Sequence, residues 1–429
     1  MSEKATLPVS QETASQAATS AGWLSFSERA HDGALLPGAH FPTRKDEAWH
    51  YTSLQMLGRT AWKEPCPMAL QKARAFLDRL ELPEAQGLIV FGNGFEVPEL
   101  TRLPQGVRRL SSTSSRSDAS LPVDMQNCFS EQLNAALCQE GLRLQVPENQ
   151  DAGLIIMVSL HDGADMSTHL RHEFLLEKDA ALQVLEIATG VGHYLANPVT
   201  RVTCSAGARC LHVKQQNESP QAVHLALLGS VVEEGAVYDG FTLNQGSELG
   251  RHEVRGALAG AHAHTQVNAL QVVGGDRLND LTSRIRHQAP DCTSRQTVRS
   301  VLDEKGVGVF QGQILVERAA QKTDGEQLNQ ALLLSEEAQI NSKPELRIFA
   351  DDVKCSHGAT VGALDEDQLF FLRARGIAEP QARAMLVEAF LEESLALVKE
   401  TELRAYLTRC LRASLPGAGA PECRLEEEG

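Results

Sequence analysis

Cys355 and His357 are the residues whose types and spacing best suit metal chemistry. One residue separates them in Cys355-Ser356-His357, directly before Gly358. Alternate side chains of a strand point to the same face, so a strand here would present a thiolate and an imidazole together. Both groups bind iron, and imidazole can replace thiolate on an iron–sulfur unit. We therefore interpret the pair as candidate metal ligands at the end of the β-rich part of the chain.

Two donors supply only half of a tetrahedral set, so a site at Cys355 and His357 needs further donors. A second chain, exogenous sulfide or a distant residue could provide them. The alternative interpretation is a buried thiol beside a hydrogen-bonded histidine, with no metal. On the chemistry of the residues alone, this interpretation without a metal is preferred, and the metal site stays open.

Other histidines and cysteines form weaker patterns. His262 and His264 lie two positions apart and could share a strand face, but no third ligand is evident nearby. Cys210 and His212 have the same spacing and the same deficiency. His172-Glu173 and His252-Glu253 each begin an H-E-x-x-H pattern whose second histidine is missing, which excludes a zincin site.

Nucleotide-binding signatures are missing from the sequence. No segment matches G-x-x-x-x-G-K-[ST], the phosphate-binding loop of many ATPases. Gly92-Asn93-Gly94 lacks the third glycine of a dinucleotide fingerprint and is better interpreted as a tight β-turn. We therefore expect no ATP chemistry on this chain.

Composition indicates a globular protein with a sizeable core. Of the 429 residues, 42% are hydrophobic and 22% are charged. A formal net charge of −16 argues against broad binding to nucleic acid or anionic membranes. No apolar run reaches the ~18 residues of a membrane-spanning helix, and the N-terminus is polar, so we expect a cytoplasmic protein. The nine cysteines include no C-x-x-C pair, and most should be reduced core thiols.

The first 145 residues should form an N-terminal helical region. Its first ~20 residues have a disordered composition, and residues 41–57 are interpreted as a capped amphipathic segment. Residues 111–120, SSTSSRSDAS, have the composition of a flexible loop. Residues 129–137 can form a short helix.

Short β-type runs punctuated by glycine, asparagine and aspartate extend from about Leu154 to Val361. They could close as a sandwich, a barrel or a solenoid. Scarce proline and apolar residues on consecutive positions favour a solenoid, whose strands are covered on both sides. No clean repeat period is visible.

A helical pattern follows Val361. Asp365 is a plausible N-cap, and Gly376 is placed where a helix would end. Pro380 suits the first turn of a second helix, which should reach about Val398. A third helix is predicted from the spacing of four residues: Leu403, Leu407, Cys410 and Leu411. The tail from 416 to 429 has a disordered composition.

The run from Ala350 to Ile377, ADDVKCSHGATVGALDEDQLFFLRARGI, closely resembles the C-terminal signature of the SufD family of the SUF iron–sulfur cluster assembly machinery. In the paralogous SufB, a Glu-His-Glu-Ala-Thr-like sequence would replace Cys355 to Thr360. Residues 42–54, PTRKDEAWHYTSL, are similar to the family's N-terminal motif. Further family-like positions are Phe310, Gly312, Ile314, Val316, Gln327, Asn329 and Leu332 to Ser335.

The resemblance implies a mainly β protein: a right-handed parallel β-helix over residues 146–362, with an ATPase-docking helical domain at 363–415. It also implies a cytoplasmic complex in which the β-helix ends of SufB and SufD pair and two copies of the ATPase SufC bind the helical domains. A homodimer without SufB and a flavin on the complex are further implied. The family's positions for nascent cluster assembly at the SufB interface match Cys355 and His357. The docking helices carry four candidates that either face SufC or form the core of the helical domain itself: Leu369, Leu372, Leu386 and Phe390.

The leading hypothesis is therefore a noncatalytic scaffold subunit that supports iron acquisition and the assembly of a transient iron–sulfur cluster. One alternative is a stand-alone metal-binding β-solenoid protein that uses His262 and His264. Another is a polysaccharide-active β-helix enzyme, which would need paired carboxylates in a groove. Asp351 and Asp352 are the only tempting pair, but adjacent strand residues point to opposite faces.

Overall fold

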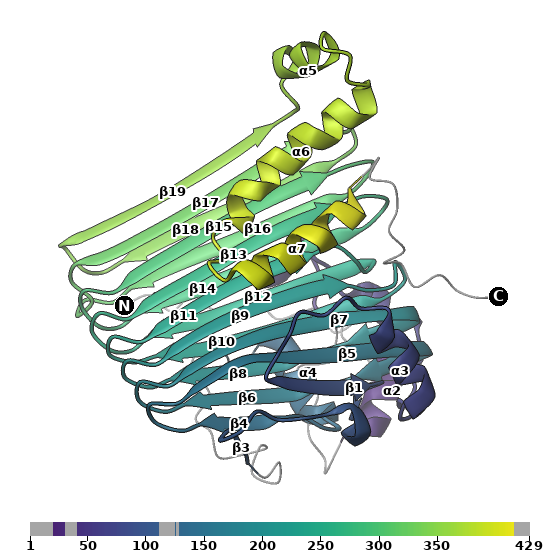
Figure 1. Ribbon diagram of the computed structural model, residues 1–429, viewed down its shortest axis with the longest axis vertical. Helices are drawn as coiled ribbons and strands as arrows, with labels where there is room; N and C mark the ends of the chain where they lie inside the picture. The colour runs from purple at the N-terminus through teal and green to yellow at the C-terminus, as the bar shows by residue number, and fades with distance from the viewer. Residues whose placement is uncertain (1–19, 31–40, 111–124, 126–127, 416–429) are drawn as a thin grey trace.

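The computed structural model describes residues 20–30, 41–110, 125 and 128–415, and its core is a parallel β-solenoid of about eight turns (Figure 1). The N-terminal residues 1–19, the serine-rich segment 111–120 and the tail 416–429 lie outside the described residues. Within the described residues, no helix is both long and apolar enough to span a membrane.

The solenoid consists of two sheets of parallel strands, which we name sheet 1 and sheet 2. Sheet 1 contains β4 (Arg143–Val146), β6 (Arg171–Leu176), β8 (Val199–Cys204), β10 (Val223–Val232), β12 (Leu249–Leu258), β14 (Leu278–His287), β16 (Val307–Val316) and β18 (Gln339–Ile348). Sheet 2 contains β1 (Gly87–Gly92), β5 (Asp151–Thr168), β7 (Ala181–Ala196), β9 (Arg209–Asn217), β11 (Val237–Asn244), β13 (His264–Val273), β15 (Thr293–Leu302), β17 (Thr323–Leu333) and β19 (Val353–Gly362).

The short strands β2 (Phe95–Glu96) and β3 (Arg108–Arg109) pair antiparallel with β1 and β4. The β1–β2 hairpin turns at Asn93 and Gly94, which have φ values of 52° and 83°. Two successive positive φ values are typical of a type I′ turn, for which Asn-Gly is a favoured sequence. The interpretation of Gly92-Asn93-Gly94 as a tight turn is confirmed.

The length of one coil varies along the solenoid. Leu249 pairs with Leu278 and Leu278 pairs with Val307, so a coil takes 29 residues there. The coil from Val223 to Leu249 takes 26 residues. The coil from Val307 to Gln339 takes 32. Strand pairing is continuous through these coils, so the turns absorb the differences.

The solenoid interior is filled by alternate residues of both sheets. On β14, the buried and inward-facing residues include Leu281, Ile285 and His287, whereas the side chains between them are more exposed. This alternation with period two gives an apolar core between the sheets. The core also encloses charges: Glu186 pairs with Lys214 and, at 3.1 Å, with His212.

Helices cover the outer faces of both sheets. The N-terminal segment packs on sheet 1 through α2 (Ala21–Arg29), α4 (Phe129–Leu137) and the 3-10 helices η2 (Glu47–Trp49) and η3 (Gln55–Arg59). Helices α3 (Leu70–Asp78), α6 (Glu379–Leu395) and α7 (Thr401–Ser414) pack on sheet 2. The 3-10 helix η4 (Pro98–Leu100) follows β2, and α5 (Glu366–Arg373) extends beyond the last strands, at the top of Figure 1.

The C-terminal helices begin and end near the predicted residues. The Asp365 side chain accepts hydrogen bonds from the backbone N–H groups of Asp367 and Gln368 at the start of α5. Gly376 has a φ of 85°, as a glycine after a helix does. Pro380 lies in the first turn of α6, and α7 buries Leu403 and Leu407. Residues 41–57, predicted as one capped amphipathic segment, contain η2 and η3.

Candidate functional site at the open end of the solenoid

Cys355 and His357 lie on β19, in the last coil of the solenoid. β19 pairs with β17 and β18 pairs with β16. Within the described residues, no strand pairs with the other edge of either one. We call β18 and β19 the open coil, because both sheets end there with a free edge.

The Cys355 side chain points into the solenoid. It packs against an apolar cluster that includes Ile314 and Val316 of β16. Its partner in the strand register is Gly325, and a Cβ at that position would lie 3.5 Å from the Cys355 Sγ. His357 lies two residues further along β19, so its imidazole leaves the strand on the same face, and it is exposed at the free edge. The prediction that both side chains emerge together from the end of the β body agrees with this placement.

Burial raises the pKa of the Cys355 thiol above its usual value, and the nearby carboxylate of Asp324 raises it further. A hydrogen bond from the backbone of Gly325 opposes these effects. The thiol is therefore mainly protonated at neutral pH, and a metal must displace its proton in order to bind. Among the described residues, no group of three or more His, Cys, Asp or Glu side chains could hold a metal ion.

The other predicted pairs do not form sites. His262 lies in a turn with a φ of 60°, whereas His264 begins β13 and is 3.7 Å from Asp239. Cys210 and His212 point into the core, where the imidazole contacts Glu186 and the Tyr238 hydroxyl, the latter at 3.2 Å. The buried side chains of Cys210 and His212 therefore already have protein partners, which explains their burial without a metal, whereas His262 is exposed.

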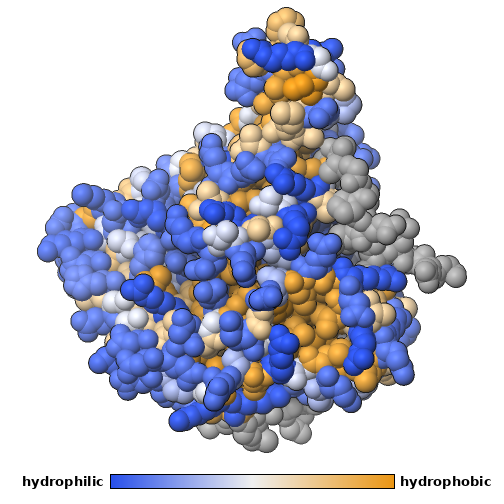
Figure 2. All heavy atoms as spheres, in the orientation of Figure 1, coloured by the Kyte–Doolittle hydropathy of each residue, from blue (hydrophilic) through white to orange (hydrophobic). Residues whose placement is uncertain are grey.

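The helices beyond the open coil carry exposed aromatic residues. Phe370 and Phe371 of α5 are 72% and 54% exposed, and Met385 of α6 is 43% exposed. Figure 2 shows this apolar surface around α5 at the top of the molecule. The four residues predicted to face SufC are more buried than these. Leu369 is buried, and the half-buried ones are Leu372, Leu386 and Phe390.

A cavity of about 520 Å³ lies between α6 and the solenoid, at the base of α5. Its wall is mostly apolar, and three charged residues line it: Asp303, Glu379 and Arg383. The apolar lining includes Leu334, Leu364, Pro380 and Val387.

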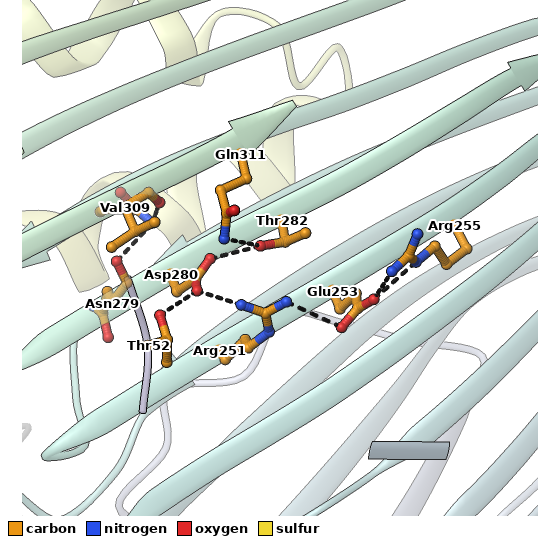
Figure 3. Close-up of polar contacts among 10 residues, drawn as sticks. Thr52, Arg251, Glu253, Arg255, Asn279, Asp280, Thr282, Val309 and Gln311 are labelled. Carbon is orange, nitrogen blue, oxygen red and sulfur yellow. Dashed lines mark hydrogen bonds and ion pairs between the residues drawn. The ribbon is translucent and has the colours of Figure 1, made fainter. Parts of the chain in front are cut away.

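A buried ion network that no sequence motif reveals lies on the outer face of sheet 1 (Figure 3). Arg251 pairs with Asp280 at 2.5 Å and with Glu253 at 3.3 Å. Asp280 also accepts a hydrogen bond from Thr52, and the Arg251 guanidinium lies 4.1 Å from the centre of the Trp49 ring. The network therefore attaches the N-terminal segment to β12 and β14.

A second arginine attaches α6 to sheet 2. Arg299 of β15 donates a hydrogen bond to the backbone carbonyl of Phe390 and pairs with Glu393. Its guanidinium also lies 4.9 Å from the centre of the Phe390 ring. These contacts fix α6 two strands below β19, in the ladder β15–β17–β19.

Comparisons with known proteins identify the family. A family model described as "SUF system FeS cluster assembly, SufBD core domain" matches residues 159–390. The chain is 30% identical to the SufBD family protein slr0076 of Synechocystis, covering 88% of each chain. It is 30% identical to iron-sulfur cluster assembly protein SufD of Escherichia coli, covering 88% of this chain and 90% of that one.

Protein ABCI7 of Arabidopsis thaliana chloroplasts is also 30% identical, over 85% of this chain and 80% of its own. The resemblance inferred from the Cys355 and N-terminal motifs is thus confirmed. Because the family model spans more than half of the sequence and these relatives align along most of it, the chain belongs to the SufBD family of iron–sulfur cluster assembly proteins.

Proposed function

We propose that this chain is a noncatalytic scaffold subunit of the SUF machinery, paired with SufB through the open coil and bound to SufC through the C-terminal helices. Iron and the nascent cluster are its cargo. One observation carries the proposal: the inward-facing thiol–imidazole pair that matches the family's positions lies on a strand with a free edge, so a partner that covers this edge also reaches the pair.

The two strands of the open coil differ in how they protect their edges. β18 contains Pro344 and the charged residues Lys343, Glu345 and Arg347, which are typical of edges that resist pairing. β19 has no proline, and Lys354 is its only Lys, Arg, Asp or Glu. The β19 edge is therefore suited to pair with a strand of SufB by extending the sheet.

Pairing at β19 would complete the donor set. Cys355 and His357 supply one thiolate and one imidazole, and SufB or sulfide would supply the rest. Enclosure by the partner would also protect the Cys355 thiol from oxidation. The raised pKa of this thiol keeps it protonated and unreactive until iron binds.

SufC docking on α5 and α6 is supported by the exposed side chains of Phe370, Phe371 and Met385. These three residues are adjacent in the sequence to three of the four predicted ones. Exposed aromatic side chains are frequent anchors of protein interfaces. Dimerisation of ATP-bound SufC would pull on these helices and open the interface at β19. The flavin and the homodimer stay predictions.

Coexpression with SufB and SufC, followed by pull-down through this chain and analysis of iron and sulfide, tests the proposal. We expect His357→Ala to retain both partners and lose at least half of the bound iron. Ser356→Ala is the matched control, because Ser356 is exposed and lies between the two donors on the opposite face of β19.

Two results would contradict the proposal. Equal iron and sulfide in the His357→Ala and wild-type complexes would exclude the ligand role. Failure of the wild-type chain to capture SufB, with only a homodimer recovered, would exclude the scaffold role in a mixed complex.

A further inference from the structure

Gln327 and Asn329 of β17 are buried polar residues without partners. Each is 1% exposed, and the nitrogen and the oxygen of both amides make no hydrogen bond with any described residue. An unsatisfied buried polar group costs about 1–3 kcal/mol. Four such atoms, one strand below the open coil, are therefore available for an interaction that forms when the site is loaded.

The strand register aligns Gln327 with His357. Gln296 of β15 pairs with Gln327 of β17, which pairs with His357 of β19. Paired residues of parallel strands point to the same face, about 4.8 Å apart. A ladder of two amides thus rises through the solenoid interior and ends at the imidazole.

The surroundings leave room for this ladder. A Cβ at Gly312, on the opposite sheet, would lie 3.1 Å from the Gln327 Nε2, so a side chain at that position would press on the amide. At the lower end, the Oε1 of Gln296 accepts a hydrogen bond from the Ser283 hydroxyl at 2.5 Å. The Nε2 of Gln296 has no partner among the described residues and is available to the next amide.

We propose that Gln327 is a positioning residue for His357. In the metal-loaded site, its Oε1 accepts the N–H of the imidazole, so that the other ring nitrogen is directed toward the metal. Gln296 donates its Nε2–H to Gln327 and holds the amide in this orientation. This inference rests on the proposed role of His357 as a ligand.

The chemistry of metal-bound histidine supports this assignment. A neutral imidazole ligates through one nitrogen and carries a proton on the other, and an acceptor for that proton fixes the tautomer and the ring orientation. Within the described structure, Gln327 is the register partner of His357 and has a free acceptor oxygen. Loss of such an outer acceptor typically weakens metal affinity about 10–100-fold.

The test uses the complex of the full-length chain with SufB and SufC, purified without metal and titrated with Co(II). The readout is the part of the Co(II) absorption spectrum that His357→Ala abolishes. We expect Gln327→Met to weaken Co(II) binding about 10-fold or more. We expect Gln327→Glu to bind within about threefold of wild type, because its carboxylate also accepts the imidazole N–H.

The control is Gln339→Met, a glutamine exposed on β18 of the same coil, which should leave the Co(II) affinity unchanged. Rescue by Gln327→Glu separates positioning from packing. If the amide only filled space, the buried carboxylate of Gln327→Glu would weaken Co(II) binding more than the methionine of Gln327→Met does. If Gln327→Met does not assemble, Gln327→Ala, which adds no volume, replaces it.

Wild-type affinity in the Gln327→Met complex, with binding still lost in His357→Ala, would overturn the positioning role and leave the proposed function intact. A Co(II) spectrum that His357→Ala does not change would overturn both the ligand role of His357 and the positioning role of Gln327. Equal losses in Gln327→Met and Gln327→Glu would show a structural amide and overturn the positioning role.

Discussion

Asp280 and Arg251 form the most buried ion pair of the network that attaches the N-terminal segment to sheet 1. Arg251 is 1% exposed, and Asp280 is its nearest carboxylate, at 2.5 Å. Removing one partner of a buried pair leaves the other charge uncompensated, which typically costs about 3–5 kcal/mol. Without Asp280, Arg251 would keep only Glu253, which already pairs with Arg255, so two buried arginines would share one carboxylate.

We expect Asp280→Ala to lower the free energy of unfolding by about 3 kcal/mol or more, because Arg251 keeps its charge in a buried position. Urea unfolding followed by circular dichroism measures the change. The matched control is Asp276→Ala, whose side chain is 87% exposed and 3.9 Å from Lys305, and which should change stability by less than about 0.5 kcal/mol. Equal effects of the two substitutions would contradict this account.

For single residues, the spacing in the sequence predicts which side chains share a strand face, but it does not predict contacts between distant segments. Cys355 and His357 share a face because they lie two residues apart on a strand, as expected. The Arg251 network joins β12 to Thr52 and Trp49, which are about 200 residues away in the sequence. The only local signal was the alternation of charges at Arg251, Glu253 and Arg255.

Among the elements, the helices after Val361 were predictable because their signals are local: a capping aspartate, a proline in a first turn and a glycine after the end. The solenoid was only favoured by the sequence. Its coils take between 26 and 32 residues, so no fixed period appears. The family resemblance was needed to choose a solenoid over a sandwich or a barrel.

The contact between α6 and sheet 2 depends on Arg299. We expect Arg299→Ala to increase hydrogen exchange of the α6 amides severalfold, because the hydrogen bond to the Phe390 carbonyl and the contact with its ring are lost. Mass spectrometry of exchanged peptides measures this. Arg383→Ala, which removes an exposed pair with Glu379, should leave α6 protected. Unchanged exchange in Arg299→Ala would mean that apolar packing alone holds the helix.

Buried histidines should make the protein sensitive to acid. Burial lowers the pKa of His161 and of His172 to about 4, and that of His169 to about 3. In the unfolded chain these groups bind protons below a pKa of about 6.5, whereas the folded protein keeps them neutral. The unfolded state therefore binds more protons as the pH falls from about 6.5 to 4, and stability decreases by about 1.4 kcal/mol per pH unit for each histidine.

Replacing one of these histidines should reduce that slope. We expect His161→Phe, which keeps a ring beside Tyr194, to lower the dependence of the unfolding free energy on pH by about one proton between pH 6.5 and 4. Urea midpoints measured at constant ionic strength give the slope. His50→Phe, at an exposed position, should not change it. An unchanged slope in His161→Phe would show that this imidazole is protonated in the folded protein.

For the whole molecule, the two proposed partner surfaces are separate and can be disrupted independently. Phe349 begins the connection between β18 and β19, and Val361 lies near the end of β19. The two residues are 62% and 56% exposed. We expect Phe349→Ser with Val361→Ser to reduce SufB capture about tenfold and leave SufC capture unchanged, because only the contacts at the open coil are lost. Quantitative pull-down of the coexpressed complex measures both partners.

Phe370→Ser with Phe371→Ser on α5 should have the opposite effect, with SufC lost and SufB retained. Each pair of substitutions thus serves as the control for the other. Loss of both partners in both variants, without a change in the unfolding midpoint, would contradict two separate docking surfaces.

The variation in coil length also indicates that a peptide can be inserted into the turns between strands. The turn between β13 and β14, residues 274–277, includes Gly275 with a φ of 65° and the exposed Asp276. Because neighbouring coils already differ by several residues while their strands stay in register, an insertion after Asp276 would lengthen one loop and leave the strand ladder aligned. An affinity epitope at this turn would give a purification handle on the flank of the molecule, three strands of the ladder β13–β15–β17–β19 away from the last coil.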